Sequence, residues 1–286
     1  MNWIILPAYN EESSLPKLIP KLDEQMSSVK LEYKLVVCDD GSFDKTAAIL
    51  LELQAKYPIV ILTHEINRGL GEAERDLFEY AANNADSNDY IIRLEGDDTH
   101  DPKYVIDLIN KLEEGYDVVN TSRFQPGGGA HGLSFFRTML SRAANGFMKL
   151  LFGIKGVKDF SCGFRIYKAS VIQDAISIYG NYFIQMKGLG FTSTLEVLVK
   201  LNMMGCKFAE VPFVLRYDMK ESASKMVASV TTLGYFSMAI LYLWPFGGWK
   251  NQYKKLRKIY PENRPSAVDQ FGYVNLKKRS ASKISF

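Results

Sequence analysis

Apolar runs and amphipathic stretches alternate through the first half of the chain. Short and almost continuous apolar runs predict five strands, at residues 3–6, 35–38, 59–63, 90–94 and 118–121. Helical stretches separate them, at about 12–28, 44–57, 70–83 and 102–113. Strands without polar alternation are buried on both faces, and helices of this length are typical crossovers between parallel strands. The pattern predicts an α/β fold with a Rossmann-like, mostly parallel sheet flanked by helices.

Acidic residues follow three of the first four predicted strands. Glu11 follows the first strand, Asp39 and Asp40 the second, and Asp97, within EGDD at 95–98, the fourth. The carboxyl ends of parallel strands meet at one edge, where open sheets bind ligands, so these acids are expected to lie together. A solvated loop would explain any one of these acidic groups taken alone. Three acidic groups at one edge of the sheet would repel one another, and that repulsion accumulates. A divalent cation with a phosphate ligand would offset it, and oxygen ligands favour Mg²⁺ or Mn²⁺.

Length, net charge and cysteine content limit the classes of protein to which the chain could belong. A length of 286 residues suits one sizeable domain with an appendage, and a net charge of +3 is too small to indicate nucleic acid as a partner. Three scattered cysteines argue against a disulfide framework and fit a reducing compartment. The chain runs directly into its first strand, so no signal peptide is expected.

A Gly-rich loop at 125–132, expected to act as a lid, precedes another amphipathic stretch. The stretch predicts a helix over about 133–152 with an apolar stripe made of Phe136, Leu140, Ala144, Phe147 and Leu151. Basic residues lie off that stripe, at Arg137, Arg142 and Lys149. The helix is therefore either a core helix with a solvated basic face or a helix on a membrane surface.

Residues 226–249 carry no charge and are numerous enough to span a bilayer. Polar residues and glycine dilute the stretch, and basic residues flank both of its ends, whereas a single span tends to carry them on one side. We therefore predict a membrane-interfacial helical segment over 226–259, in preference to a span or a core helix. The polar, basic tail at 260–286 would add attraction to anionic lipid.

Six short motifs, taken in order, resemble the family 2 glycosyltransferases of the GT-A fold, in their polyprenyl-phosphate branch. The motifs are PAYNE at 7–11, DDGS at 39–42, EGDDTH at 95–100, TSRF at 121–124, DFSCGFR at 159–165 and RYDMKESASK at 216–225. The resemblance covers residues 1–230 and implies a GT-A catalytic domain over 1–225. It is specific because six weak motifs occur in the right order.

The resemblance implies a site for a nucleotide-sugar donor. Its residues would be Pro7, Tyr9, Glu11, Asp39, Asp40, Glu95 and Gly96. Asp39 would accept a hydrogen bond from the base, and Asp40 would lie near the ribose. The Asp-x-Asp element that holds the metal in this family begins here with Glu95. We therefore expect Asp97 as the direct ligand of Mg²⁺ or Mn²⁺ and Glu95 as its helper.

The resemblance also implies a site for the acceptor. Arg123, Arg137 and Ser141 match residues that hold the phosphate of an acceptor lipid, and arginine suits phosphate because it binds two oxygens at once. Asp159 matches an acid near the acceptor. It would act as a base if the acceptor were a hydroxyl, and its alternative role is an ion pair with Arg165.

A late basic motif would close over the diphosphate with Arg216, Ser224 and Lys225. The expected catalytic set is thus Asp97, Arg123, Asp159, Arg216 and Lys225. Glu196 lies in an otherwise apolar stretch, so it is expected either to orient an arginine of the site or to be a partly exposed helical acid.

Together with these residues, the resemblance implies an inverting, metal-dependent enzyme that moves a hexose from a nucleoside-diphosphate sugar to a dolichyl or undecaprenyl phosphate. It would be membrane-associated, at the cytoplasmic face. An ionised lipid phosphate is already a nucleophile and needs positioning more than a base. Two alternatives stay open. One is an enzyme of the same fold that glycosylates a saccharide or protein hydroxyl, and the other is a non-catalytic membrane scaffold that binds nucleotide-sugars.

Overall fold

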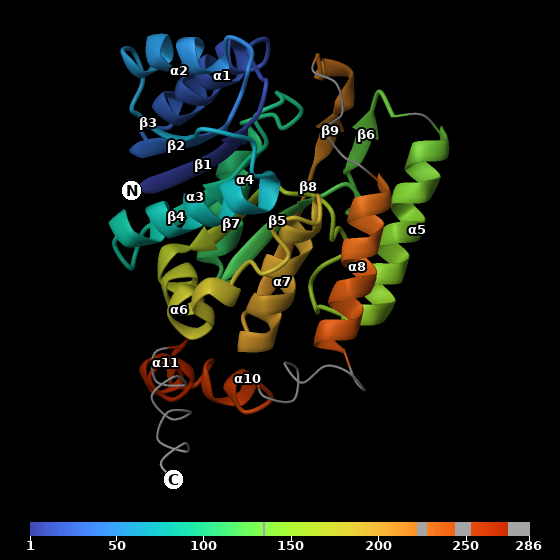
Figure 1. Ribbon diagram of the computed structural model, residues 1–286. Coiled ribbons are helices and arrows are strands. Elements are labelled where there is room, and N and C mark those ends of the chain that lie inside the picture. The colour runs from blue at the N-terminus through green and yellow to red at the C-terminus, as the bar shows by residue number, and fades with distance from the viewer. Residues whose placement is uncertain (134, 222–227, 244–252, 274–286) are drawn as a thin grey trace.

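A seven-stranded sheet forms the centre of the computed structural model, which describes residues 1–133, 135–221, 228–243 and 253–273 (Figure 1). The strand order is β3-β2-β1-β4-β7-β5-β8, and only β7 runs antiparallel to its neighbours. The strands are β1 (Asn2–Ala8), β2 (Tyr33–Asp40), β3 (Ile59–His64), β4 (Tyr90–Arg93), β5 (Val118–Ser122), β7 (Arg165–Lys168) and β8 (Phe208–Pro212). The five predicted strands are confirmed, and the sheet is mostly parallel as expected.

Two further strands, which the sequence analysis did not predict, form a small parallel sheet. They are β6 (Gly129–His131), within the Gly-rich loop, and β9 (Val214–Arg216). The predicted lid is therefore partly an ordered strand. The pairing brings residues near 130 beside the late basic motif.

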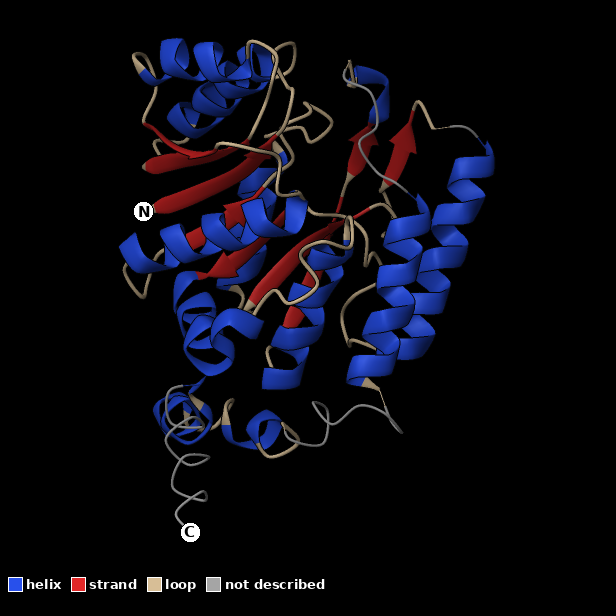
Figure 2. Cartoon of the chain, in the orientation of Figure 1, coloured by secondary structure: helices blue, strands red, loops and turns tan. Residues whose placement is uncertain are grey.

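Helices lie on both sides of the sheet (Figure 2). They are α1 (Leu15–Ser28), α2 (Thr46–Gln54), α3 (Leu70–Asn84), α4 (Tyr104–Glu113), α5 (Phe135–Phe152), α6 (Ala169–Tyr179), α7 (Thr192–Met204), α8 (Ala228–Tyr242), α10 (Leu256–Ile259) and α11 (Arg264–Phe271), with short 3₁₀ turns η1 (Gly180–Tyr182) and η2 (Tyr217–Met219). The four helices predicted between the first five strands are confirmed, with boundaries that differ by a few residues.

The central strand β1 shows why the sheet needs two helical layers. Its side chains alternate between faces, so Ile4 and Leu6 join one core with α1, α2 and α4. Trp3 and Ile5 join the opposite core with α3, α6 and α7. All four side chains are buried, which explains the continuous apolar run in the sequence.

Helices α5 and α8 lie side by side at one edge of the molecule (Figure 1), and the rings of Phe147 and Phe236 are 5.6 Å apart. Short helices α10 and α11 pack near α7 and α6.

No helix among the described residues is both long and apolar enough to cross a bilayer. The predicted interfacial segment falls partly on 226–227 and 244–252, and much of the predicted tail on 274–286, which lie outside the described residues.

Candidate active site

The carboxyl ends of β2, β1 and β4 lie next to one another and bring the predicted donor-site residues together. Gly96 lies against the end of β1, because a Cβ atom there would come within 2.9 Å of the Pro7 carbonyl oxygen. Glu11 is buried beside them and accepts a hydrogen bond from Ser14 at 3.0 Å. Glycine at position 96 thus lets the acidic turn after β4 approach β1 closely.

The two acids at the end of β2 shape neighbouring loops. The Asp39 carboxylate accepts the Ser42 N–H at 3.1 Å. Asp40 accepts the backbone N–H groups of Arg68 and Gly69, at 2.9 and 2.8 Å, and its Oδ1 is 2.6 Å from His64 Nδ1. Asp40 therefore orders the chain that leads into α3, while its role near a ribose stays a prediction.

Tyr9 is half-buried on the loop after β1, where its ring meets Phe43 edge to face at 6.1 Å. Phe43 is 83% exposed. An exposed aromatic ring on the loop that follows β2 provides an apolar surface on which a nucleobase could stack.

The acidic turn after β4 carries its own compensating charges. Three ion pairs neutralise it: Glu95 with Arg93 at 2.5 Å, Asp97 with Lys220, and Asp98 with Lys21 at 2.6 Å. The repulsion that indicated a bound cation is thus offset in this structure by basic side chains. Arg93 lies only two positions before Glu95, whereas Lys21 and Lys220 were missed because no local pattern connects them to the turn.

Arg93 lies at the centre of a buried set of charges. Its Nη2 is 2.7 Å from Glu74 Oε1, an ion pair that lacks hydrogen-bond geometry, and its Nη1 donates to Glu95. Gly163 makes room for the guanidinium, because a Cβ atom at that position would lie 1.7 Å from Arg93 Nη1. This explains the glycine within the DFSCGFR motif.

Replacing Gly163→Ala is expected to lower the free energy of unfolding by about 1–3 kcal/mol, because the buried guanidinium has little room to move. Urea denaturation measures the change. Gly146→Ala is the matched control, since a Cβ there meets nothing within 4 Å and alanine is favoured inside a helix by about 1 kcal/mol. Equal effects of the two substitutions would show that the contact with Arg93 is unimportant.

Asp97 is linked to the small sheet through Thr99. Its Oδ1 accepts the Thr99 hydroxyl at 2.6 Å, and the Thr99 carbonyl accepts the N–H of Arg216 in β9 at 3.2 Å. Burial alone would raise the pKa of Asp97, but the Lys220 ammonium and the Thr99 hydroxyl outweigh it and hold that pKa below its usual value. The carboxylate is therefore ionised at neutral pH.

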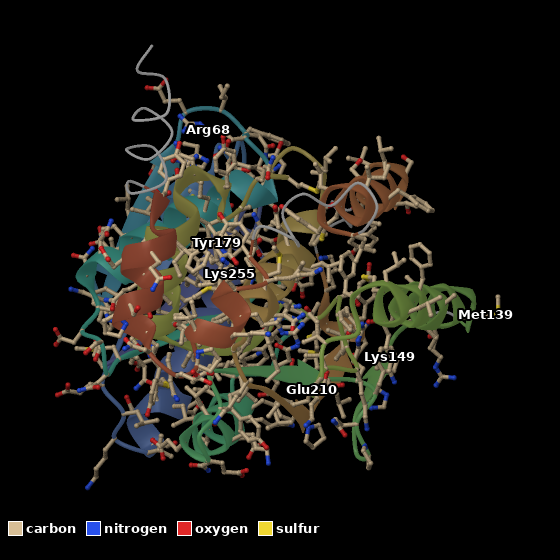
Figure 3. The ribbon with its side chains drawn as sticks, turned by 90° about the horizontal axis from the view of Figure 1, so that it is seen from below. Arg68, Met139, Lys149, Tyr179, Glu210 and Lys255 are labelled. Atoms are coloured by element: carbon tan, nitrogen blue, oxygen red, sulfur yellow. The ribbon has the colours of Figure 1, made fainter. Side chains whose placement is uncertain are left out.

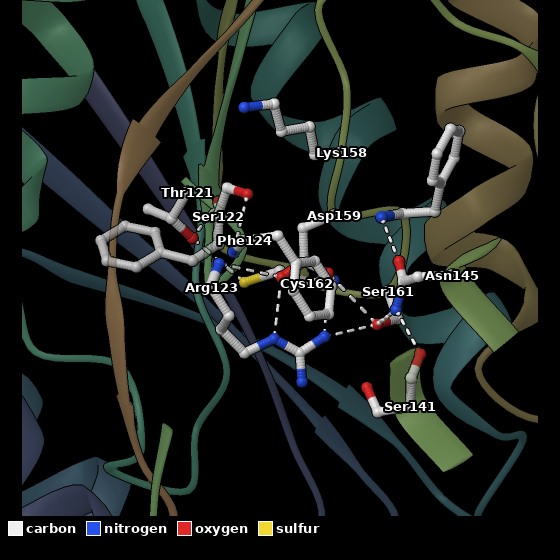
Figure 4. A network of polar contacts seen from close by, with 12 residues as sticks. Thr121, Ser122, Arg123, Phe124, Ser141, Asn145, Lys158, Asp159, Ser161 and Cys162 are labelled. Atoms are coloured by element: carbon white, nitrogen blue, oxygen red, sulfur yellow. Dashed lines mark hydrogen bonds and ion pairs between the residues drawn. The ribbon is translucent and has the colours of Figure 1, made fainter. Parts of the chain in front are cut away.

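Arg123 and Asp159 form a bidentate ion pair (Figure 4). Arg123 Nε and Nη2 lie 2.8 Å from the two oxygens of Asp159, and Nη2 also donates to Ser161 at 2.7 Å. Asp159 is fully buried, and although burial raises its pKa, Arg123 outweighs this and lowers it. The alternative partner proposed for Asp159 is wrong, because Arg165 instead donates to the carbonyls of Thr194 and Phe160.

Asn145 of α5 connects the acceptor helix to this pair, although the sequence analysis did not single it out. Its Oδ1 accepts the Phe160 N–H at 2.7 Å, and its Nδ2 donates to the carbonyl of Ser141 and to the Ser161 hydroxyl, at 2.9 and 3.2 Å. A chain of hydrogen bonds through Asn145 and Ser161 thus connects Ser141 to Arg123 (Figure 4). No sequence signal marked it, because the burial that distinguishes this asparagine is visible only in the structure.

Truncating Asn145→Ala is expected to cost about 1–3 kcal/mol of unfolding free energy, because the buried Phe160 N–H loses its acceptor. Chemical denaturation measures the loss. Asn84→Ala is the control, since that asparagine is exposed and donates to the Tyr80 carbonyl at 2.8 Å. A cost no larger than that of the control would contradict the anchoring role.

The late basic motif is only partly described. Arg216 is exposed and forms a bidentate pair with Asp218, at 3.0 and 2.7 Å. Ser224 and Lys225 lie outside the described residues, as does the side chain of Arg137, whose backbone belongs to α5. The roles predicted for these residues stay predictions.

Glu196 does not orient an arginine, and it is not partly exposed. It is fully buried in α7, accepts the backbone N–H groups of Gln185 and Met186 at 2.9 Å, and receives the Tyr242 hydroxyl. Burial lowers the pKa of nearby Lys200 to about 8, although Glu196 opposes this. This acid joins α7 to α8, away from the sheet edge.

Residues 3–175, more than half of the chain, match the family model described as Glycosyl transferase family 2. The chain belongs to glycosyl transferase family 2. The resemblance carried by the six motifs is thus confirmed at the level of the family. The match includes the acidic turn, Arg123 and Asp159.

Curated relatives of this glycosyltransferase family member carry polyprenyl-phosphate names. Dolichol-phosphate mannosyltransferase of Pyrococcus furiosus is 29% identical over 211 residues, which are 73% of this chain and 55% of the relative. Undecaprenyl-phosphate 4-deoxy-4-formamido-L-arabinose transferase of Edwardsiella ictaluri is 30% identical over 199 residues, 69% of this chain and 58% of the relative. The chain spans about half the length of the curated relatives it matches.

Solved structures share the fold. Glucosyl-3-phosphoglycerate synthase from Mycobacterium tuberculosis, crystallised with Mn²⁺, uridine diphosphate and phosphoglyceric acid, has a TM-score of 0.57 at 16% identity, over 84% of this chain and 77% of that one. TarS from S. aureus has a TM-score of 0.53 at 16% identity, over 92% and 73%. The mostly parallel sheet with flanking helices is the GT-A fold, as predicted.

The acidic turn suits a divalent cation that takes few ligands from the protein. No group of three or more His, Cys, Asp or Glu side chains poised to hold a metal occurs among the described residues. However, Asp97 already attracts a cation, the Lys220 ammonium, and the neighbouring donors are carboxylates. Mg²⁺ is commonly bound by one or two carboxylates, with substrate phosphates and water completing its shell, so these residues fit such an ion.

Proposed function

We propose that this chain is an inverting, metal-dependent glycosyltransferase that moves a hexose from a nucleoside-diphosphate sugar to a polyprenyl phosphate. The observation that carries the proposal is the gathering of Glu11, Asp39, Glu95 and Asp97 at the adjoining ends of β1, β2 and β4, in a family 2 chain. The names of the curated relatives support the polyprenyl phosphate acceptor.

The donor would bind at this edge. Pro7, Tyr9 and Asp39 would hold the nucleoside, with Asp40 near the ribose. Asp97, helped by Glu95, would hold Mg²⁺ or Mn²⁺, which supplies Lewis-acid stabilisation of the leaving diphosphate. Arg216 and Lys225 would add positive charge around the same diphosphate.

The acceptor phosphate would bind at Arg123, with Arg137 and Ser141 from α5. Figure 4 draws no contact from Arg123 Nη1, so within the described residues this nitrogen is available to a phosphate oxygen. The depressed pKa of Asp159 keeps it ionised and paired, which suits positioning of Arg123 better than proton abstraction. This favours a phosphate nucleophile over a hydroxyl that needs a base.

His100 is a poor candidate for a base. It is buried, stacks on Phe164 at 5.3 Å, and its Nδ1 accepts the Glu95 N–H at 3.2 Å. Burial lowers the pKa of His100 to about 4, so it is neutral at physiological pH. We therefore assign the reaction to positioning and charge stabilisation.

The surface of α5 and α8 would rest on the membrane, at its cytoplasmic face. It exposes large apolar side chains, namely Met139, Phe147, Leu150, Leu233, Phe236 and Ile240. Met139 projects at the outer end of α5 (Figure 3), and the basic residues Arg142 and Lys149 are exposed on the same helix. Apolar side chains beside cations suit the interface of an anionic bilayer. We assign residues 1–225 to catalysis, 226–259 to the interface and 260–286 to a basic tail.

A product assay tests the proposal. The purified chain is incubated with Mn²⁺, a short-chain polyprenyl phosphate and a panel of uridine- and guanosine-diphosphate sugars, and lipids are analysed by mass spectrometry. We expect one donor to yield the polyprenyl phosphate with one added hexosyl group. Transfer to a saccharide or protein hydroxyl would support the first alternative, and nucleotide-sugar binding without any product would support a scaffold.

A further inference from the structure

Lys220 directs its side chain into the acidic turn from a distant part of the sequence. It follows η2, and its ammonium contacts Asp97 Oδ2. The side chains of Lys220 and Asp97 are only 12% and 14% exposed. Burial lowers the pKa of Lys220, but Asp97, Glu11 and Glu95 outweigh it and raise that pKa. The ammonium thus lies among the acids that the donor site would use.

The segment that carries Lys220 is held at three further points, one on the acidic turn, one on the Gly-rich loop and one on α1. The Arg216 N–H donates to the Thr99 carbonyl at 3.2 Å. Asp218 packs against Gly132, where a Cβ atom would lie 2.5 Å from the Asp218 nitrogen. Glu221 forms an ion pair with Lys17 of α1. These contacts fix residues 216–221 next to the acidic turn and hold the ammonium in place.

We propose that Lys220 is a built-in counter-ion that occupies the cation position at Asp97 while the donor site is empty, and that a divalent cation displaces it. The inference rests on the proposed function, because it takes Asp97 as the ligand. An ammonium and a divalent ion repel each other at such short range, so the same carboxylate oxygen does not hold both. Binding of the two cations is therefore mutually exclusive.

The exchange links metal binding to the donor. A divalent cation that binds alone removes the ion-pair partner of Lys220 and leaves its largely buried ammonium without a compensating charge. When a nucleoside diphosphate arrives with the ion, its phosphate oxygens supply a new partner for the displaced ammonium. The cation consequently binds weakly by itself and more tightly together with the diphosphate, and residues 217–221 shift as it binds.

Binding of Mn²⁺ without nucleotide tests the proposal. Electron paramagnetic resonance of free Mn²⁺ gives the dissociation constant. We expect Lys220→Met to bind Mn²⁺ at least about tenfold more tightly than the unmodified chain, and Lys220→Arg to bind it weakly. Lys103→Met is the control, because Lys103 pairs with exposed Asp101 at 3.1 Å, outside the acid set, and should leave the affinity unchanged.

Thermal unfolding in chelator gives a second readout that needs no metal. Lys220→Met should melt at a lower temperature there, because Asp97 loses its ion pair, and added Mn²⁺ should raise its melting temperature more than that of the unmodified chain. Equal Mn²⁺ affinity in the two proteins would overturn the displacement and leave the metal site intact. Absence of Mn²⁺ binding to both, with and without nucleoside diphosphate, would overturn the displacement and the proposed metal dependence together.

Discussion

Replacing Asp97→Asn is expected to lower kcat about a thousandfold while the fold persists. Loss of a divalent cation at a leaving diphosphate removes several kcal/mol of transition-state stabilisation, and about 4 kcal/mol corresponds to a factor of a thousand. The amide oxygen still accepts the Thr99 hydrogen bonds, so the chain should stay folded, although loss of the ion pair with Lys220 should lower its melting temperature. Glycolipid formation under saturating donor measures the loss.

Asp101→Asn is the matched control for this substitution. It makes the same chemical change four residues along the turn, at a carboxylate that is 37% exposed and paired with Lys103. The control should retain nearly full turnover. Full turnover by Asp97→Asn itself would exclude Asp97 as the cation ligand, and unfolding of that variant would assign it a structural role.

Replacing Arg93→Met is expected to lower the free energy of unfolding by about 3–5 kcal/mol, because it leaves buried acids without their cation. The side chains of Arg93 and Glu74 are each 2% exposed, and that of Glu95 is 21% exposed. Guanidinium denaturation measures the effect. The variant should also displace Glu95 and so weaken donor binding.

A second substitution separates lost charge from lost packing in that variant. Adding Glu74→Gln to Arg93→Met removes one uncompensated charge and should recover at least about 1 kcal/mol. Arg75→Met is the control, because Arg75 is a quarter exposed and its pairs with Glu72 and Glu79 are worth less than about 1 kcal/mol. If Arg93→Met cost no more than Arg75→Met, the buried ion pairs would not stabilise the fold.

The sequence pattern predicted the first five strands because each is a continuous apolar run buried on both faces. It missed β7, whose run is only Ile166 and Tyr167 between the charged residues Arg165 and Lys168. Arg165 is nevertheless buried, and it donates to the carbonyl of Thr194, which lies 29 positions along the chain. Tertiary partners of this kind leave no local signal, and the same holds for Glu210 in β8, which accepts the N–H groups of Lys158 and Asp159.

The residues of the candidate site were likewise predictable only in part. Acids were predictable because each group directly follows a strand, and the topology then brings the groups together. Their basic partners were not, because Lys21 lies 77 positions from Asp98 and Lys220 lies 123 positions from Asp97. Repulsion among the acids is therefore a weaker argument for a bound metal than the sequence suggested, because basic side chains offset it. The argument for a metal now depends on membership of glycosyl transferase family 2 and on the chemistry of a diphosphate donor.

The most direct measurement is diffraction at the manganese absorption edge from crystals grown with Mn²⁺ and a nucleoside diphosphate. We predict an anomalous peak roughly 2 Å from an Asp97 carboxylate oxygen, bridged to the diphosphate, with the Lys220 ammonium moved off Asp97. Nucleotide density at the sheet edge with no anomalous peak, and with Lys220 still paired to Asp97, would contradict the account.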